Sequence, residues 1–280
     1  MGRFRTGRDL AKMSWSVIRK EKSLLVFPII SAFVTLMIAA SFFLPLWFLT
    51  GGDAFTQWYA WVMIFVWYIL AFTVSIFCNV ALMANATKVM EGENPTVGYG
   101  LGFAASRFKY ILEWAIFSAI VGVILQAIRK QGGLLGNIAA AVIGAAWAVA
   151  TYFVVPIMAF EKLGPLGAVK RSLLFLRSNW GEGLIANLSI GLVFFLLALA
   201  GFIPIIIGVL LFGSMGVGAV IAGFAIAIIY WVILAVIASA MKQVVVAAMY
   251  RYATTGKSYM GLEQKFPLHQ SQQQTGPKTW

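Results

Sequence analysis

Six long apolar runs, separated by shorter polar segments, dominate the chain. They cover residues 24–48, 58–83, 111–127, 134–160, 184–212 and 218–241. About 20 apolar residues in a helix cross the roughly 30 Å hydrocarbon core of a bilayer. The pattern therefore predicts an all-α membrane protein with six transmembrane helices. Pro45, Pro156 and Pro204 fall inside or near the ends of these runs, where neighbouring helices can satisfy the backbone groups that a kink frees.

Two of the polar segments, 91–113 and 161–183, share a pattern: a Glu at the end of a span, a Pro, a short helix, a basic residue, an aromatic residue and the next span. The aligned pairs are Glu91 and Glu161, Pro95 and Pro165, Arg107 and Arg177, and Tyr110 and Trp180. In each copy the proline suits the first helical position, and the residue before it, Asn94 or Gly164, suits an N-cap. The pattern indicates an internal repeat.

Each copy also predicts an amphipathic helix. In the later copy the apolar stripe is Leu166, Val169, Leu173, Leu176 and Trp180. The earlier copy has the stripe Val97, Leu101, Ala104 and Phe108, and a looser third instance near the N-terminus has Leu10, Met13 and Val17. We therefore expect three parallel hairpin repeats, each preceded by a cytoplasmic amphipathic interfacial helix. The units are about 5–90, 91–160 and 161–252, followed by a polar tail at 253–280.

Composition and charge agree with a polytopic membrane protein. The chain is 61% hydrophobic and only 11% charged, whereas soluble domains have roughly 25% charged residues. Its net charge of +12 comes from bases that flank the spans, which argues against nucleic-acid binding. All of the 21 Lys and Arg residues except Arg129 and Lys130 fall on one side of the six spans. By the positive-inside rule we expect both termini in the cytoplasm and the chain in the plasma (inner) membrane. Trp114 and Trp180 are expected to anchor the inner boundary.

The basic residues of the three short helices are candidates for binding lipid headgroups or a protein partner. They are Lys170, Arg171, Arg177, Arg107, Lys109, Arg19 and Lys20. We expect an anionic membrane surface as their main partner. A cytoplasmic protein partner, a small ligand and a homo-oligomer stay open.

Polar residues within the apolar runs are the other candidates. Asn79, Glu113 and Asn187 stand out, because ionisable or amide groups at membrane depth are expensive to bury. Glu113 lies four residues after Lys109, so an ion pair along one helix face explains it, with a proton- or cation-responsive role as the alternative.

Several chemistries lack the residues they need. Cys78 is the one cysteine and His269 the one histidine, and no phosphate-binding loop, metal-ligand set or nucleophile–base arrangement is present. We expect no cofactor and no enzymatic activity. The predicted function is a non-catalytic membrane protein that organises lipid or anchors partners. The alternatives are an oligomeric channel or passive transporter with a weakly polar pore and, less favoured, a lipid-modifying enzyme with Glu113 as its one candidate acid.

The segment 152–184, YFVVPIMAFEKLGPLGAVKRSLLFLRSNWGEGL, resembles the signature of a family of six-span bacterial and archaeal membrane proteins of unknown function. The residues that carry the resemblance include Pro156, Glu161, Gly164, Pro165 and Trp180. More loosely, the segment is similar to membrane domains found beside glycerophosphodiester phosphodiesterases. The resemblance implies the six-span fold and an inner-membrane location, and it implies no activity.

Overall fold

The computed structural model describes residues 3–50, 58–178, 182–211 and 216–255, and every element within these ranges is helical. The helices are α1 (Arg3–Lys20), the short 3-10 helix η1 (Lys22–Leu25), α2 (Val26–Thr50), α3 (Trp58–Met90), α4 (Val97–Ala105), α5 (Phe108–Gln131), α6 (Gly133–Ala150), α7 (Val154–Glu161), α8 (Pro165–Ser178), α9 (Glu182–Ala200), α10 (Ile203–Leu210) and α12 (Val217–Thr255). The predicted tail begins within α12, and its part beyond Thr255 lies outside the described residues.

Six segments of the described chain are long and apolar enough to cross a membrane. They are Lys22–Phe48, Tyr59–Met90, Phe108–Lys130, Leu135–Glu161, Gly191–Leu210 and Val217–Thr255. Each one overlaps one of the six predicted spans, so the prediction of an all-helical, multi-pass membrane protein is confirmed. α3 and α12 continue as helices well past their apolar runs.

Two of the spans are interrupted shortly before a proline. Residues 151–153 separate α6 from α7, ahead of Pro156, and residues 201–202 separate α9 from α10, ahead of Pro204. A break in a span frees carbonyl groups that need partners within the hydrocarbon. At the second break, Tyr230 and Trp231 of α12 supply them: the Tyr230 hydroxyl donates to the Leu197 carbonyl at 2.7 Å, and Trp231 Nε1 donates to that of Ala198 at 2.9 Å.

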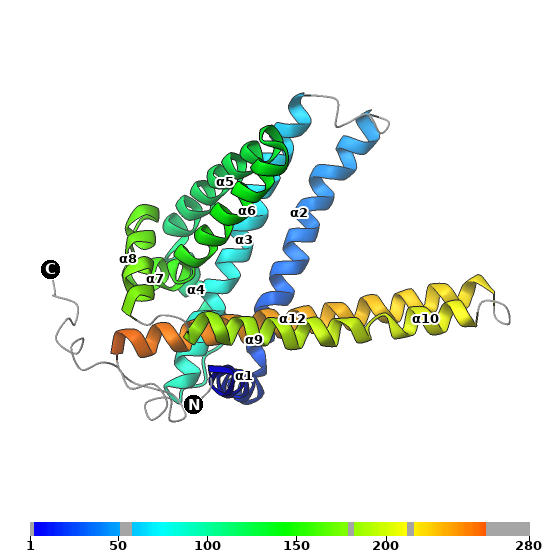
Figure 1. Cartoon of the computed structure of the whole chain (residues 1–280). Coiled ribbons are helices and arrows are strands. Elements are labelled where there is room, and N and C mark those ends of the chain that lie inside the picture. The colour runs from blue at the N-terminus through cyan, green and yellow to red at the C-terminus, as the bar shows by residue number, and fades with distance from the viewer. Residues whose placement is uncertain (1–2, 51–57, 179–181, 212–215, 256–280) are drawn as a thin grey trace.

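Figure 1 shows two groups of spans that diverge from a common region. We call α2, α3, α5 and α6 the ascending arm, and the hairpin of α9 and α10 with α12 the lateral arm. The region where they meet, which we call the base, contains α1, α4, α7, α8 and the C-terminal part of α12. The main core cluster gathers largely at the base, with buried residues such as Phe27 of α2, Met83 of α3 and Val245 of α12. Large apolar side chains farther along the arms are exposed, as expected for surfaces that face lipid.

The first and last described helices contact each other in the base. Met13, Val17 and Ile18 of α1 are buried, in agreement with the predicted stripe for Met13 and Val17. The buried hydroxyl of Ser14 donates to the Met241 carbonyl of α12 at 3.1 Å. The side chain of Leu10, also in the predicted stripe, lies outside the described residues.

The two short helices predicted to be equivalent, α4 and α8, begin and pack differently. α8 begins at Pro165 directly after Gly164, as predicted. α4 begins at Val97 and is capped by Thr96, whose hydroxyl accepts from Tyr99 N at 3.2 Å, so the predicted cap at Asn94 is wrong. The cap moves because a threonine after the proline offers the side-chain oxygen that the first turn needs.

The buried face of α8 also differs from the predicted stripe. Ala168, Ser172, Phe175 and Leu176 are buried, whereas Leu166 and Leu173 are 73% and 48% exposed. Only Leu176 belongs to both sets. The protein-facing side combines the small residues Ala168 and Ser172, which allow close helix contact, with Phe175 and Leu176, whereas Leu166 and Leu173 lie on the outer side.

Candidate functional site

The Glu161 carboxylate lies at the centre of a polar cluster in the base. Glu161 ends α7, and Lys162 after it adopts a left-handed conformation (φ 55°) that turns the chain into α8. Through this turn Arg171 of α8 returns to Glu161, with 3.1 Å between Arg171 Nε and Glu161 Oε2. The Tyr250 hydroxyl of α12 donates to Glu161 Oε1 at 3.1 Å. We call Glu161, Arg171 and Tyr250 the Glu161 cluster.

Aromatic rings pack against the Glu161 cluster. The Arg171 guanidinium lies 4.7 Å from the ring centre of Phe175, a cation–π distance. Phe160 stacks on Tyr250 with ring centres 5.5 Å apart. The Glu161 and Arg171 side chains are 25% and 41% exposed, so their ion pair is partly shielded and worth more than a fully exposed one.

Arg107 extends this arrangement toward α5. Its Nε donates to the Ala159 carbonyl at 2.8 Å, and its guanidinium lies 5.0 Å from the centre of the Phe103 ring. The last carbonyls of a helix lack partners within the helix and carry partial negative charge. Arg107 therefore caps the C-terminal end of α7 and fixes the position from which Glu161 projects.

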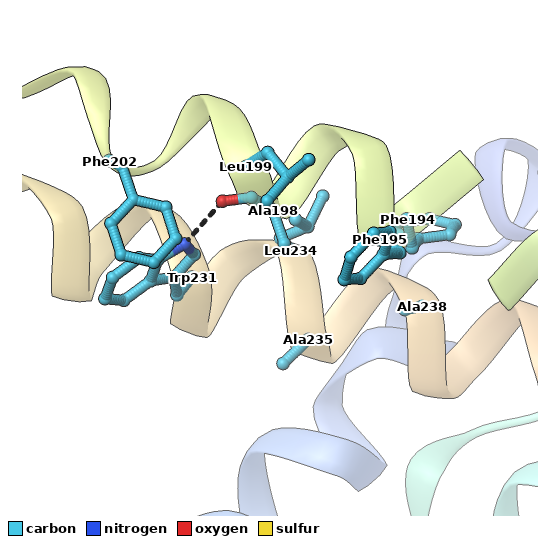
Figure 2. A pocket seen from close by; sticks show the side chains of 9 residues that line it. All are labelled: Phe194, Phe195, Ala198, Leu199, Phe202, Trp231, Leu234, Ala235 and Ala238. Carbon is cyan, nitrogen blue, oxygen red and sulfur yellow. Dashed lines mark hydrogen bonds between the residues drawn. The ribbon is translucent and has the colours of Figure 1, made fainter. Parts of the chain in front are cut away.

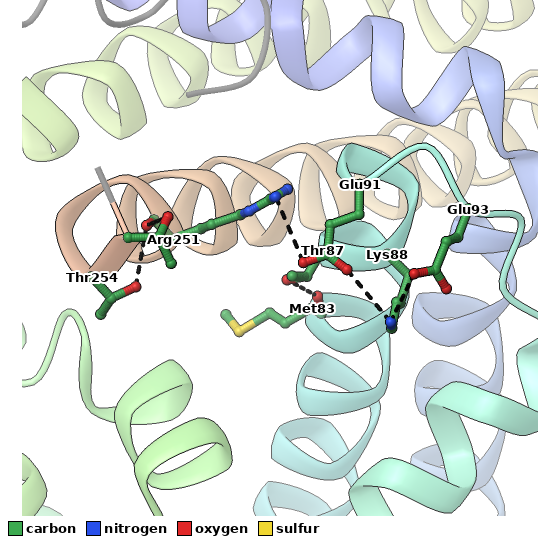
Figure 3. Close-up of polar contacts among 8 residues, drawn as sticks. Met83, Thr87, Lys88, Glu91, Glu93, Arg251 and Thr254 are labelled. Atoms are coloured by element: carbon green, nitrogen blue, oxygen red, sulfur yellow. Dashed lines mark hydrogen bonds and ion pairs between the residues drawn. The ribbon is translucent and has the colours of Figure 1, made fainter. Parts of the chain in front are cut away.

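A second polar cluster surrounds Glu91, at the end of α3 (Figure 3). Glu91 Oε1 pairs with Arg251 of α12 at 3.6 Å, and its Oε2 pairs with Lys88 at 3.5 Å. Lys88 also contacts Glu93 at 2.9 Å. We call Glu91, Lys88, Glu93 and Arg251 the Glu91 cluster.

Adjacent residues of α12 join the two clusters. Tyr250 contacts Glu161, and Arg251 contacts Glu91. The two glutamates that the sequence pattern aligned therefore both contact the last turns of α12. This arrangement locks α3, α7 and α8 to the end of α12.

The seven basic residues predicted to bind lipid or partner fall into different environments. Arg171 and Arg107 have partners within the protein. Arg19, Lys20 and Lys170 are exposed, and the Lys109 side chain is 80% exposed. The side chain of Arg177 lies outside the described residues.

The predicted intramembrane polar residues are separated as well. Glu113 lies 4.0 Å from Lys109, in agreement with the predicted pair along one helix face. Asn79 lines a groove of ≈ 540 Å³ between α2, α3 and α12. The side chain of Asn187, and Trp180 of the aligned motif, lie outside the described residues. Trp114 is buried against Phe117 and Trp147, so its predicted position as a boundary anchor is wrong.

The chemistry of the clusters favours a structural role. Each glutamate has a cationic partner, and no group of three His, Cys, Asp or Glu residues in the described ranges is placed to hold a metal ion. The sequence interpretation missed the roles of Tyr250 and Arg251, as well as that of the fully buried Asn85, whose amide donates to the Thr96 carbonyl at 3.0 Å. The position of Asn85 just beyond the apolar run of span two was the one signal in the sequence, and in the structure the residue faces Gly100 of α4.

Comparison with known families gives one match. Residues 59–260 match the family of unknown function DUF6159, which is well over half of the chain. The chain belongs to this family. The DUF6159 match includes both glutamate clusters, α4, α8 and the two interrupted spans. No curated protein and no solved structure matches the chain, so the looser similarity to phosphodiesterase-associated membrane domains gains no support.

Proposed function

We propose that this DUF6159 protein is a non-catalytic inner-membrane protein that binds the anionic lipid surface through exposed basic faces of α1 and α8. The observation that carries the proposal is the composition of those two faces. Each helix packs small or apolar residues against the rest of the protein. On its outer side, Lys or Arg residues lie beside large apolar side chains. Such a face suits the boundary between lipid headgroups and acyl chains.

On α1 the outer face contains Lys12, Trp15 and Arg19, which follow one another at helical spacing. Trp15 is 42% exposed, and both bases are exposed. An indole ring between two cations matches the headgroup level, where the ring lies in the interface and the cations reach phosphates.

On α8 the outer face contains Leu166, Lys170 and Leu173. This face differs from the predicted stripe, yet it has the same combination of a base and exposed leucines. Leucine on the outer side of a polar-flanked helix is expected when that side meets acyl chains. In the described residues Lys170 has no acidic partner, so its charge is available to a lipid phosphate.

Exposed bases supply the electrostatic part of the proposal: Lys12, Arg19 and Lys20 on α1, Lys170 on α8 and, outside these two helices, Lys109 of α5. The test below changes the four of them that the sequence analysis singled out. A base near an anionic leaflet contributes about 1 kcal/mol of attraction, which is roughly fivefold in affinity. Arg107 and Arg171 are left out, because their guanidinium groups already have partners within the protein.

The test is the retention of phosphatidylglycerol by the full chain released from nanodiscs into a native mass spectrometer. We expect the combined variant Arg19→Gln, Lys20→Gln, Lys109→Gln and Lys170→Gln to lose most of the phosphatidylglycerol that the parent keeps, and to keep phosphatidylcholine equally. The preference of the parent for phosphatidylglycerol should fall as salt is raised.

The matched control neutralises Arg129 and Lys130, the two bases on the opposite side of the spans. Their change to glutamine should leave phosphatidylglycerol retention within about twofold of the parent, less than the roughly fivefold attributed to one base at the surface. Equal retention by the four-fold variant and the parent would overturn the proposal.

A second candidate function is a channel formed by several copies. The observation that favours it is the groove beside Asn79 and Ser75, which carries weakly polar groups along the spans and is open on one side. Several chains arranged around an axis would be needed to close it into a pore. Ion or small-solute flux from proteoliposomes, abolished by Asn79→Leu, would support this function, and the absence of flux across a broad solute panel would exclude it.

A further inference from the structure

The groove between α2, α3 and α12 has an unusual lining for a surface at membrane depth. Each of the three helices contributes residues spaced four apart: Ser31 and Thr35 from α2, Ser75 and Asn79 from α3, and Ala235 and Ser239 from α12. Residues four apart lie on one face of a helix. Five hydroxyl or amide side chains from three helices therefore face the same space, which holds ≈ 540 Å³.

Most of these polar groups have no partner within the described part of the chain. Asn79, Ser75, Thr35 and Ser239 make no hydrogen bond to any described residue, and Ser31 lies beside the Cys78 thiol. An amide in hydrocarbon needs hydrogen-bond partners, because lipid tails supply none. The groove therefore offers donors and acceptors, with Asn79 able to do both.

A second groove, of ≈ 440 Å³, lies between α9 and α12, with Phe202 from the break between α9 and α10 at one end (Figure 2). Aromatic and aliphatic side chains line it, including Phe194, Phe195 and Trp231. The one polar hydrogen among these three, Trp231 Nε1–H, is already donated to the Ala198 carbonyl. This groove therefore offers only apolar contact.

Ala235 of α12 belongs to the lining of both grooves. No Lys, Arg, His, Asp or Glu lines either groove. The helical rise of about 1.5 Å per residue puts Ser31 roughly 13 Å along its span from Lys22. Ser31 thus lies deeper than Lys22, and the polar group nearest to a base is Ser239, three residues before the exposed Lys242 of α12. Because no charged side chain lines the groove itself, a charged headgroup would find no counter-charge there.

From this lining we infer a binding site for one neutral amphiphile. Its uncharged head, with hydroxyl or amide groups, bonds Asn79, Ser75 and Ser239, and its apolar chain crosses Ala235 into the groove beside Phe195 and Trp231. The site goes beyond the proposed surface function: it lies on another part of the molecule and selects lipids without charge.

The experiment uses the full chain in phosphatidylcholine nanodiscs and a monoacylglycerol that carries a diazirine in its acyl chain. After illumination, labelled peptides are quantified by mass spectrometry. We expect the label to concentrate on peptides containing Phe195 or Trp231. Unlabelled monooleoylglycerol should compete at least tenfold better than dioleoylphosphatidylglycerol.

Three variants test the two ends of the site. Asn79→Leu and Ser75→Ala should each reduce labelling, Asn79→Leu by about five- to tenfold, the effect of one lost hydrogen bond in an apolar setting. Ala235→Leu should block the passage of the chain and reduce labelling similarly. Ala222→Leu is the control, because Ala222 is exposed on α12 and lines neither groove.

Label spread evenly over the exposed apolar residues of α2 and α12 would overturn the inference. So would equal competition by dioleoylphosphatidylglycerol, or parental labelling of both Asn79→Leu and Ser75→Ala. Ser75→Ala removes a single hydroxyl and guards against a folding defect in Asn79→Leu. The bases that test phosphatidylglycerol retention line neither groove, so the two proposals fail independently.

Discussion

At the scale of single residues, Gly201 and Trp231 show how an interrupted span is stabilised. A Cβ atom at position 201 would overlap the Trp231 indole. That ring cannot easily withdraw, because it donates to the Ala198 carbonyl and packs edge-on against Phe202, with ring centres 5.1 Å apart. The glycine is required here by close approach to a side chain from another helix.

We therefore expect Gly201→Ala to lower the free energy of unfolding by about 1–3 kcal/mol, the usual effect of overpacking. The measurement is the thermal unfolding midpoint in a fixed detergent. Gly191→Ala is the matched control: a Cβ there meets nothing within 4 Å, and alanine should stabilise the helix by about 0.5–1 kcal/mol. Equal midpoints for Gly201→Ala and the parent would show that Trp231 can move.

At the scale of elements, the end of α12 holds α3 and α7 through adjacent residues. The coupling between Glu161 and Arg171 should be measurable in a double-mutant cycle with Glu161→Gln and Arg171→Gln, at about 1 kcal/mol, because the pair is partly shielded. The control pair is Glu113 and Lys109, whose 4.0 Å distance and exposed lysine predict a coupling below about 0.5 kcal/mol. Additive effects at Glu161 and Arg171 would mean that the cluster does not stabilise the fold.

The elements also show which features the sequence could predict. The six apolar runs were sufficient to predict the six spans, because the length of an apolar run can be read from the local sequence alone. The inner face of α8 was not predictable, because in a membrane protein the lipid-facing side is as apolar as the core-facing side, and Leu166 and Leu173 resemble core residues. Tyr250 was equally hidden, because nothing near it in the sequence indicates that it meets a glutamate at position 161.

At the scale of the whole molecule, the two arms splay from the base, so both can cross one flat bilayer only if each is tilted. The lengths of the helices allow this. α3 has 33 residues and α12 has 39, whereas about 20 suffice for an upright span.

The predicted orientation is testable with the single native cysteine removed by Cys78→Ala. In that background, a membrane-impermeant maleimide applied to intact cells should label Lys130→Cys and should label Lys20→Cys only after permeabilisation. Because Cys78 is buried, we expect the maleimide to label it weakly even before it is replaced. Labelling of Lys20→Cys in intact cells would reverse the orientation and remove the cytoplasmic leaflet from the proposed function.

The contact between α1 and α12 has a consequence for the order of biosynthesis. Ser14 bonds the Met241 carbonyl, Glu161 contacts Tyr250, and Glu91 pairs with Arg251. These three partners all belong to α12, the last span to be synthesised, so the contacts cannot form before it is made. Hairpins can enter the bilayer one by one, yet the base cannot close until the final helix arrives. A chain truncated before α12 should therefore insert into the bilayer with its base unassembled, and its glutamates would be accessible to membrane proteases.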